Sequence, residues 1–157
     1  MSLTLPGKPL YFKKVSERRN VMTLYSHLTE LALTHAVPPA QAWENSVQIL
    51  GAQGIGTASS RGKGCPKAAF VGLAEHGYVR GFTASSDRPM RENARHALCA
   101  YRLYVADPSL LDRKALWWQA VAAERGISRK SQNGVLDVMT ALIQQDAFLP
   151  AAGTASH

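Results

Sequence analysis

Residues 56–70, GTASSRGKGCPKAAF, bring cationic side chains and a cysteine to the expected start of a helix. A helix N-terminus exposes unpaired backbone N–H groups and the positive end of the helix dipole. Flanking glycines let the backbone approach a phosphate or another anion closely. The stretch therefore predicts an anion-binding loop over residues 51–64. Its predicted ligand-binding residues are Ser60, Arg61, Lys63, Gly64, Cys65 and Lys67.

The glycine-rich loop superficially resembles a phosphate-binding P-loop, but its spacing differs. Five residues separate Gly56 from Gly62, whereas the P-loop pattern has four. Gly64 stands where that pattern has the serine or threonine that holds magnesium. No buried apolar strand precedes the loop. The sequence thus argues against a nucleotide triphosphatase, and we expect no cofactor.

Cys65 is the candidate for thiol chemistry. We expect it at the N-cap of a helix in which Pro66 is the first residue, a position that favours the thiolate, as do Arg61 and Lys63. A nucleophile also needs a base. His76 lies at the far end of the same short helix, so a histidine would have to arrive through tertiary packing. A packing role for the cysteine is therefore favoured, and a thiol-dependent enzyme is the alternative.

Two further groups of polar residues are candidate ligand-binding sites. Arg88, Arg91 and Arg95 have the i, i+3, i+7 spacing of one helix face, which predicts an anion-binding stripe unless neighbouring carboxylates pair with them. Gln132 and Asn133 stand at an expected helix start. They either cap that helix or hold a small ligand, and capping is favoured.

Adjacent indoles in LWW, residues 116–118, point about 100° apart on a helix. We expect one of Trp117 and Trp118 in the core and the other half-exposed or at an interface. An exposed tryptophan would suit a protein partner or a homodimer.

Composition excludes several classes of protein. The 157 residues are 46% hydrophobic and 18% charged, a balance typical of a globular domain rather than a disordered chain. No apolar run reaches the roughly 20 residues of a membrane span, and no signal peptide is visible. We therefore expect a soluble, cytoplasmic protein of bacterial type, without a membrane partner. Two cysteines without CxxC or His/Cys spacing predict free thiols and no metal site.

The net charge of +7 is uneven. Residues 1–21 hold five lysines and arginines against one glutamate, so 5 − 1 = +4. A basic arm can bind nucleic acid, but a disordered solubilising tail is the favoured interpretation. We divide the chain into this arm (1–20), a helical domain (21–149) and a flexible tail (150–157).

The 3.6-residue period of apolar positions, punctuated by glycine and proline, predicts a single all-α domain of about six helices. A short extended or β segment is expected near 78–82. The first expected helix runs from about residue 20 to VPP at 37–39, and the second from Pro39 to Leu50, where Gly51 stops it. The third runs from Pro66 to His76 and is stopped by Gly77; the fourth is capped by Ser86 or Asp87, has Pro89 in its first turn and ends at Val105. The fifth lies around residues 116–121 and ends at Gly126, and the sixth runs from a Ser131 cap through Ile143.

Several segments together resemble a family of unknown function, DUF6979. They are KGCPKAAFVGLAEHGYVRGF, NARHALCAYRLYVADPSLL, LWWQAV and SQNGVLDVMTALI, in that order. The motif K-G-C-P-x-x-A-F-x-G-L-x-E-x-G is matched from Lys63 to Gly77. The resemblance implies no activity, but it draws attention to residues 63–66 and 132–137 as a shared site. From the residues we favour a non-catalytic module that binds an anionic ligand, nucleic acid or a protein partner.

Overall fold

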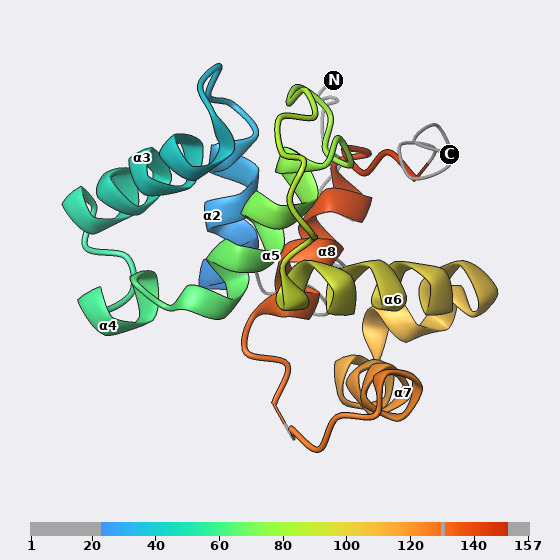
Figure 1. Ribbon diagram of the computed structural model, residues 1–157. Helices are drawn as coiled ribbons and strands as arrows, with labels where there is room; N and C mark the ends of the chain where they lie inside the picture. Colours follow the sequence, from blue (N-terminus) through green and yellow to red (C-terminus); the bar gives the residue numbers. More distant parts are fainter. Residues whose placement is uncertain (1–22, 130, 151–157) are drawn as a thin grey trace, which may run out of the picture.

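The computed structural model describes residues 23–129 and 131–150 (Figure 1). The predicted arm and nearly all of the predicted tail lie outside these residues. Six helices of nine residues or more form the described part of the chain, which confirms the all-α prediction. They are α2 (Leu24–Ala32), α3 (Pro39–Ala52), α5 (Gly64–Glu75), α6 (Glu92–Ala106), α7 (Lys114–Arg125) and α8 (Val135–Gln144), with a short α4 (Ala58–Arg61) and a 3-10 helix η1 (Pro108–Asp112).

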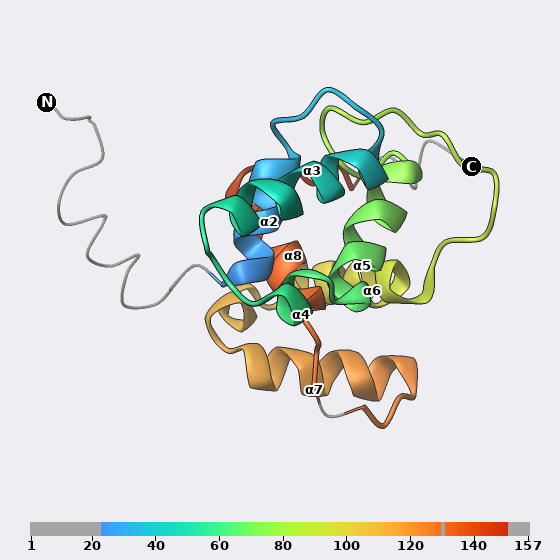
Figure 2. The same ribbon diagram turned by 90° about the vertical axis from the view of Figure 1, so that its left-hand side faces the viewer.

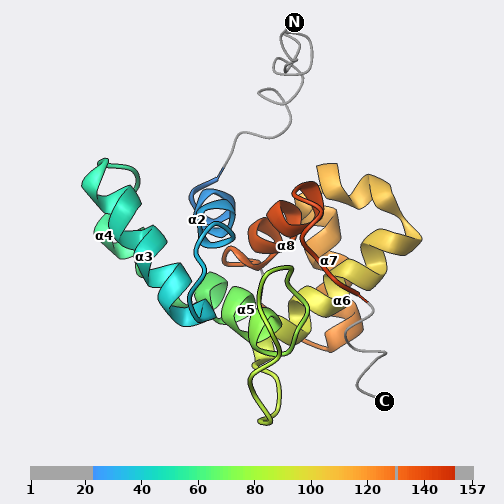
Figure 3. The same ribbon diagram turned by 90° about the horizontal axis from the view of Figure 1, so that it is seen from above.

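Helices α5 and α8 form the centre of the domain. Helices α2 to α4 lie on one side of them, and α6 and α7 lie on the other (Figures 1 and 3). Residues 69–74 of α5 and 135–142 of α8 are all buried. A helix that is apolar all round must be covered all round, so these two helices are the core on which the others pack.

Gly72 sets the crossing of α5 and α6. A Cβ built on Gly72 would lie only 2.7 Å from the Cβ of Ala94, a distance that real Cβ atoms essentially never show. Only glycine therefore allows the two helices to approach this closely.

The extended segment expected near 78–82 is a single bridge. Val79 pairs with Phe148 in antiparallel fashion, and no other strand pairing occurs in the described residues. Tyr78 stacks on Phe148 with ring centroids 5.8 Å apart. The bridge therefore ties the chain after α8 to the end of α5.

Three predictions, for a helix end, a loop and a helix start, are wrong. Gly51 does not stop α3, which runs on to Ala52. A Cβ at Gly51 would meet the Arg61 guanidinium at 3.3 Å, so this glycine permits a close side-chain approach instead. The loop predicted over 51–64 also contains α4, whose N-cap is Thr57. Ser131 does not cap α8; Gly134 holds the N-cap position with a left-handed φ of 85°.

The prediction for the tryptophans is also wrong. Trp117 and Trp118 are both buried, and each indole N–H has a backbone acceptor. Trp117 Nε1 donates to Ala100 O at 2.9 Å, and Trp118 Nε1 donates to Arg129 O at 2.8 Å. Leu116 is the member of this trio that stays exposed. Among the described helices, none is both long and apolar enough to cross a membrane.

Candidate anion-binding site

Helix α5 begins two residues earlier than the sequence suggested. Its N-cap is Lys63, followed by Gly64, Cys65 and Pro66 in the first turn. Cys65 is therefore inside the helix rather than at its cap. The prediction placed Pro66 first, but every position of the first turn lacks an intrahelical partner for its N–H and so tolerates proline. No side chain accepts a hydrogen bond at this N-cap.

The short turn from α4 to α5 brings the predicted loop residues to this helix start (Figure 2). The Lys63 backbone N–H donates to Ser60 O at 3.2 Å. The Ser60 hydroxyl accepts a bond from Thr57 at 3.0 Å. Burial raises the pKa of Tyr25, and a side-chain hydrogen bond with Ser60 opposes this effect. Ser60 thus acts mainly within the fold, linking α4 to α2.

Arg61 is folded back onto the loop. Its Nη1 donates to Ile55 O at 2.8 Å and to Gly56 O at 2.6 Å. These bonds hold the loop after α3 and fix the guanidinium in one orientation. The charge of Arg61 has no carboxylate partner among residues 23–129 and 131–150.

Arg129 joins the site from the segment between α7 and α8, and the sequence analysis did not identify it. Its Nη1 lies 3.9 Å from Cys65 Sγ, and its Nη2 donates to Asn93 Oδ1 at 3.2 Å. The guanidinium lies 5.0 Å from the ring centroid of Trp118, which favours a cation–π contact. No carboxylate pairs with it in the described residues. Residue 129 is 64 positions from Cys65, so no local sequence pattern could have indicated this contact.

Cys65 has no catalytic partner in the part of the chain that the structure describes. Neither a histidine nor a carboxylate hydrogen bonds to its sulfur there; Arg129 is its polar contact, and Cys65 otherwise packs against the core. Both Cys65 and Cys99 are free thiols, and burial raises the pKa of Cys99.

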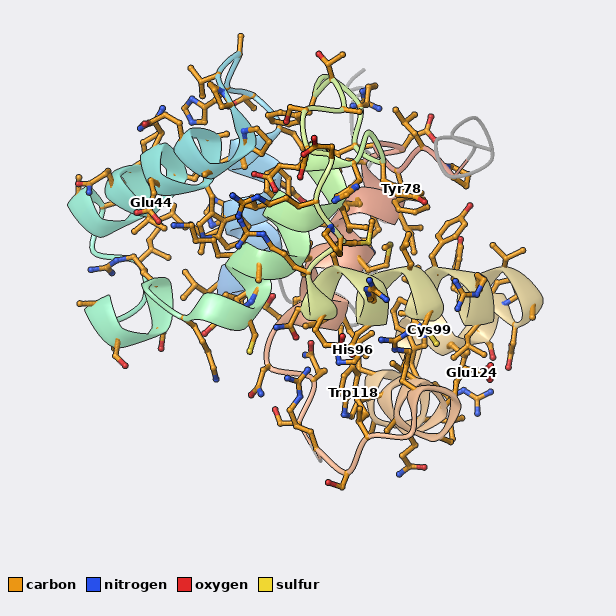
Figure 4. All side chains as sticks on the ribbon, viewed as in Figure 1. Glu44, Tyr78, His96, Cys99, Trp118 and Glu124 are labelled. Atoms are coloured by element: carbon orange, nitrogen blue, oxygen red, sulfur yellow. The ribbon has the colours of Figure 1, made fainter. Side chains whose placement is uncertain are left out.

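His96 lies in a separate network between α6 and α7. Figure 4 shows His96 and Trp118 meeting between these helices, with their rings edge to face at 5.9 Å. His96 Nδ1 accepts a hydrogen bond from Arg125 Nε at 3.2 Å, and Arg125 also pairs with Glu92 at 2.7 Å. Burial lowers the pKa of His96; Glu92 opposes this effect, and the charges of Arg125 and Arg129 add to it.

The predicted arginine stripe does not form. Helix α6 begins at Glu92, with Arg91 as its N-cap, so Arg88 lies before the helix and cannot share a face with Arg95. The sequence placed Pro89 in the first turn, but α6 starts three residues later, and neither Ser86 nor Asp87 caps it.

The individual cations of the predicted set are largely occupied. Arg91 lies 3.8 Å from Glu75, and Arg95 Nε donates to Met90 O at 3.1 Å. Lys67 forms an ion pair with Glu44 at 2.6 Å. These contacts leave Lys63 and Arg129 as the cations without a carboxylate around the start of α5, while Arg61 is turned toward the end of α3.

Gln132 acts as a cap, as the sequence analysis favoured. Its Oε1 accepts the backbone N–H of Leu136 at 2.7 Å, and its Nε2 donates to the buried Asp137 at 3.3 Å. Asp137 also pairs with Lys114. Asn133 adopts a left-handed φ of 52°. Gln132 therefore accepts a first-turn N–H of α8 from before the helix, while Gly134 holds the N-cap position.

The two segments that the family resemblance marked meet at Gly134. A Cβ there would lie 2.8 Å from Tyr25 Cδ2 and 3.0 Å from Pro66 Cβ. Residues 63–66 and 132–137 are therefore neighbours in space, and Gly134 makes their close contact possible. No group of three or more histidine, cysteine, aspartate or glutamate residues within the described ranges is arranged to hold a metal ion.

These features define a small helical domain with a cationic helix start and no assembled catalytic group in its described residues. The profile of a family of unknown function, DUF6979, matches residues 23–148, and the chain belongs to that family. No curated protein and no solved structure gives a significant match.

Proposed function

We propose that this protein is a non-catalytic helical module that binds an anionic partner at the start of α5. The binding surface, called here the cationic end of α5, comprises Lys63, Arg129 and the first-turn N–H groups of Gly64 and Cys65. Its main support is that these two cations have no carboxylate partner among the described residues, whereas Lys67 and Arg91 do. An anion at this end would also interact favourably with the positive end of the α5 dipole.

Arg129 is the most strongly oriented of these cations. Bonds to Asn93 and to Ser131 O fix two edges of its guanidinium. A guanidinium carries five N–H groups, and the contacts of Arg129 use three of them. The remaining donors are fixed before a ligand arrives, which lowers the entropic cost of binding. We include a reducing, cytoplasmic setting in the proposal, because both cysteines are free thiols.

The test is a salt-dependent titration of the whole chain. A fluorescent single-stranded DNA of roughly 20 nucleotides serves as the polyanion, and anisotropy is recorded between about 50 and 200 mM salt. We expect the logarithm of the binding constant to fall linearly with the logarithm of the salt concentration. The slope should be smaller in magnitude by about one for R129Q or K63Q than for the wild type. Since the N-terminal residues are basic as well, some binding will not involve α5.

A charge-matched variant separates the two contributions. Arg102 is exposed, lies about 13 Å further along α6 than Asn93, and has no ion-pair partner in the described residues. R102Q removes the same charge as R129Q and should leave the slope within error of the wild-type value. Equal losses for R102Q and R129Q, or no binding even at the lowest salt, would contradict the proposal.

The alternative function is a thiol-dependent reaction at Cys65, and the Arg129 guanidinium beside its sulfur favours it. Iodoacetamide labelling of the folded chain should then modify Cys65 faster than a model peptide, and R129Q should slow it. A labelling rate equal to that of the peptide would remove this alternative.

A further inference from the structure

An open cavity of about 390 Å³ lies between the second half of α3 and α4, the region that faces the viewer in Figure 2. Its only charged lining residue is Arg61, and its only other polar side chain is Gln48. The remaining lining residues are small or apolar: Val47, Gly51, Ala52, Ala58 and Gly62. Its volume falls at the lower end of the range of small-molecule sites.

The guanidinium of Arg61 is held for binding at this cavity. Its Nη1 is used by the carbonyls of Ile55 and Gly56. A Cβ on Gly51 would lie 3.3 Å from Nε and 3.5 Å from both Cζ and Nη2. Such nearly equal distances mean that the guanidinium turns its face toward Gly51. The edge that carries Nε and Nη2 is therefore not covered by Gly51, and neither nitrogen has a hydrogen-bond partner in the described residues.

We infer that this cavity binds a carboxylate that bears a short aliphatic group. The free Nε–Nη2 edge matches the two oxygens of a planar carboxylate. The methyl groups of Val47, Ala52 and Ala58 would cover a chain of two or three carbons. The inference goes beyond the proposed function by naming a second site, on the α3 side of Arg61, and its ligand class.

The surroundings favour a single negative charge over a phosphate. The last carbonyls of α3 belong to residues that line the cavity, and a helix C-terminus carries partial negative charge. Arg61 is the one cation there, so a monoanion leaves the site near neutrality, whereas a phosphate dianion would not. Phosphate would also find only one preorganised edge of donors.

The experiment titrates the ¹⁵N-labelled full chain with sodium propionate at constant ionic strength. Backbone amide shifts of Gly51, Ala52 and Gly62 report on the cavity. We expect saturation in the millimolar range, as is reasonable for so small a ligand. Propionamide, which has the same shape without the charge, and inorganic phosphate should bind at least about tenfold more weakly.

Two substitutions test the geometry. R61K keeps the charge but removes the bidentate edge, and we expect at least about a tenfold loss. A52L fills the cavity from an exposed position without touching the bonds of Arg61, and it should abolish the shifts. The matched control A40L places the same side chain at an exposed position at the other end of α3 and should bind propionate normally.

Two further arms identify the source of the carboxylate. A dipeptide with a C-terminal alanine is compared with its amide. Tighter binding of the free acid than of propionate indicates a chain terminus as the natural ligand, and weaker binding indicates a free small acid.

The inference is overturned if propionamide binds as well as propionate, or if A52L leaves the shifts unchanged. Its failure is distinguishable from failure of the proposed function. If both hold, R129Q weakens DNA binding but leaves the propionate-induced amide shifts intact. A52L abolishes the propionate-induced shifts but leaves DNA binding intact.

Discussion

Replacement of Gly72 by alanine tests whether the α5–α6 crossing is fixed as closely as the structure indicates. Alanine is favoured over glycine inside a helix by about 1 kcal/mol, so propensity alone predicts a more stable protein. The added Cβ, however, would lie 2.7 Å from Ala94 Cβ. Carbon atoms at optimal separation are about 3.5–4.0 Å apart. The helices must therefore separate by about 1 Å.

The neighbouring atom determines the sign of the effect. Ala94 Cβ is bonded directly to the α6 backbone and cannot rotate away, unlike the end of a long side chain. Overpacking of a core costs about 1–3 kcal/mol. Subtracting the gain in helix propensity leaves G72A less stable than the wild type by up to about 2 kcal/mol.

A double-mutant cycle isolates the contact. A94G alone should cost about 1–2 kcal/mol, through lost propensity and one lost buried methyl group. In the A94G background the clash is absent, so G72A should become stabilising by up to about 1 kcal/mol. Urea unfolding followed by tryptophan fluorescence measures each free energy. The reasoning is refuted if G72A destabilises both backgrounds equally, or if it stabilises the wild type.

Two further predictions concern a buried histidine and a glycine at a helix start. Burial lowers the pKa of His96 in the folded state. The contribution of His96 to the free energy of unfolding is therefore complete above the unfolded-state pKa of about 6.5. This contribution is lost as the pH falls through the lower folded-state pKa. Stability should therefore fall by up to about 1.4 kcal/mol per pH unit in that window, and urea unfolding of H96Q should lack this slope. G134A should destabilise the folded protein by about 1–3 kcal/mol more than G126A. Both glycines have positive φ, but only a Cβ at Gly134 would meet Pro66. Equal losses of stability in thermal unfolding would contradict this.

Much of the fold was predictable from local signals. Apolar residues at helical spacing and the punctuation by glycine and proline indicated six helices, and six of comparable extent are present. The stops at Gly77 and Gly126 are confirmed, since both glycines have the left-handed φ of a helix end. Local chain geometry determines such features, and it is readable one segment at a time.

Helix starts and the site were less predictable, for a physical reason. Several first-turn positions accept proline, so Pro66 did not fix the start of α5. Pro89 lies before the N-cap of α6 and is not in the helix. The occupation of each cation depends on which carboxylate packs beside it: Glu44 reaches Lys67 across 23 residues of sequence. Arg129 reaches Cys65 in the same way. Tertiary contacts therefore decide which charges stay available to a ligand.

The family motif can be divided by what its residues do in the fold. Ala69, Phe70 and Leu73 fill the core, Gly72 sets the distance to α6, Pro66 packs against Gly134, Glu75 lies beside Arg91, and Gly77 ends the helix. These contacts account for the motif from its fourth residue onward by packing alone. Of its first three residues, Cys65 packs against the core and contacts Arg129, whereas Lys63 and Gly64 are exposed. Lys63 and Gly64, at the start of α5, are therefore the part of the motif that core packing does not account for.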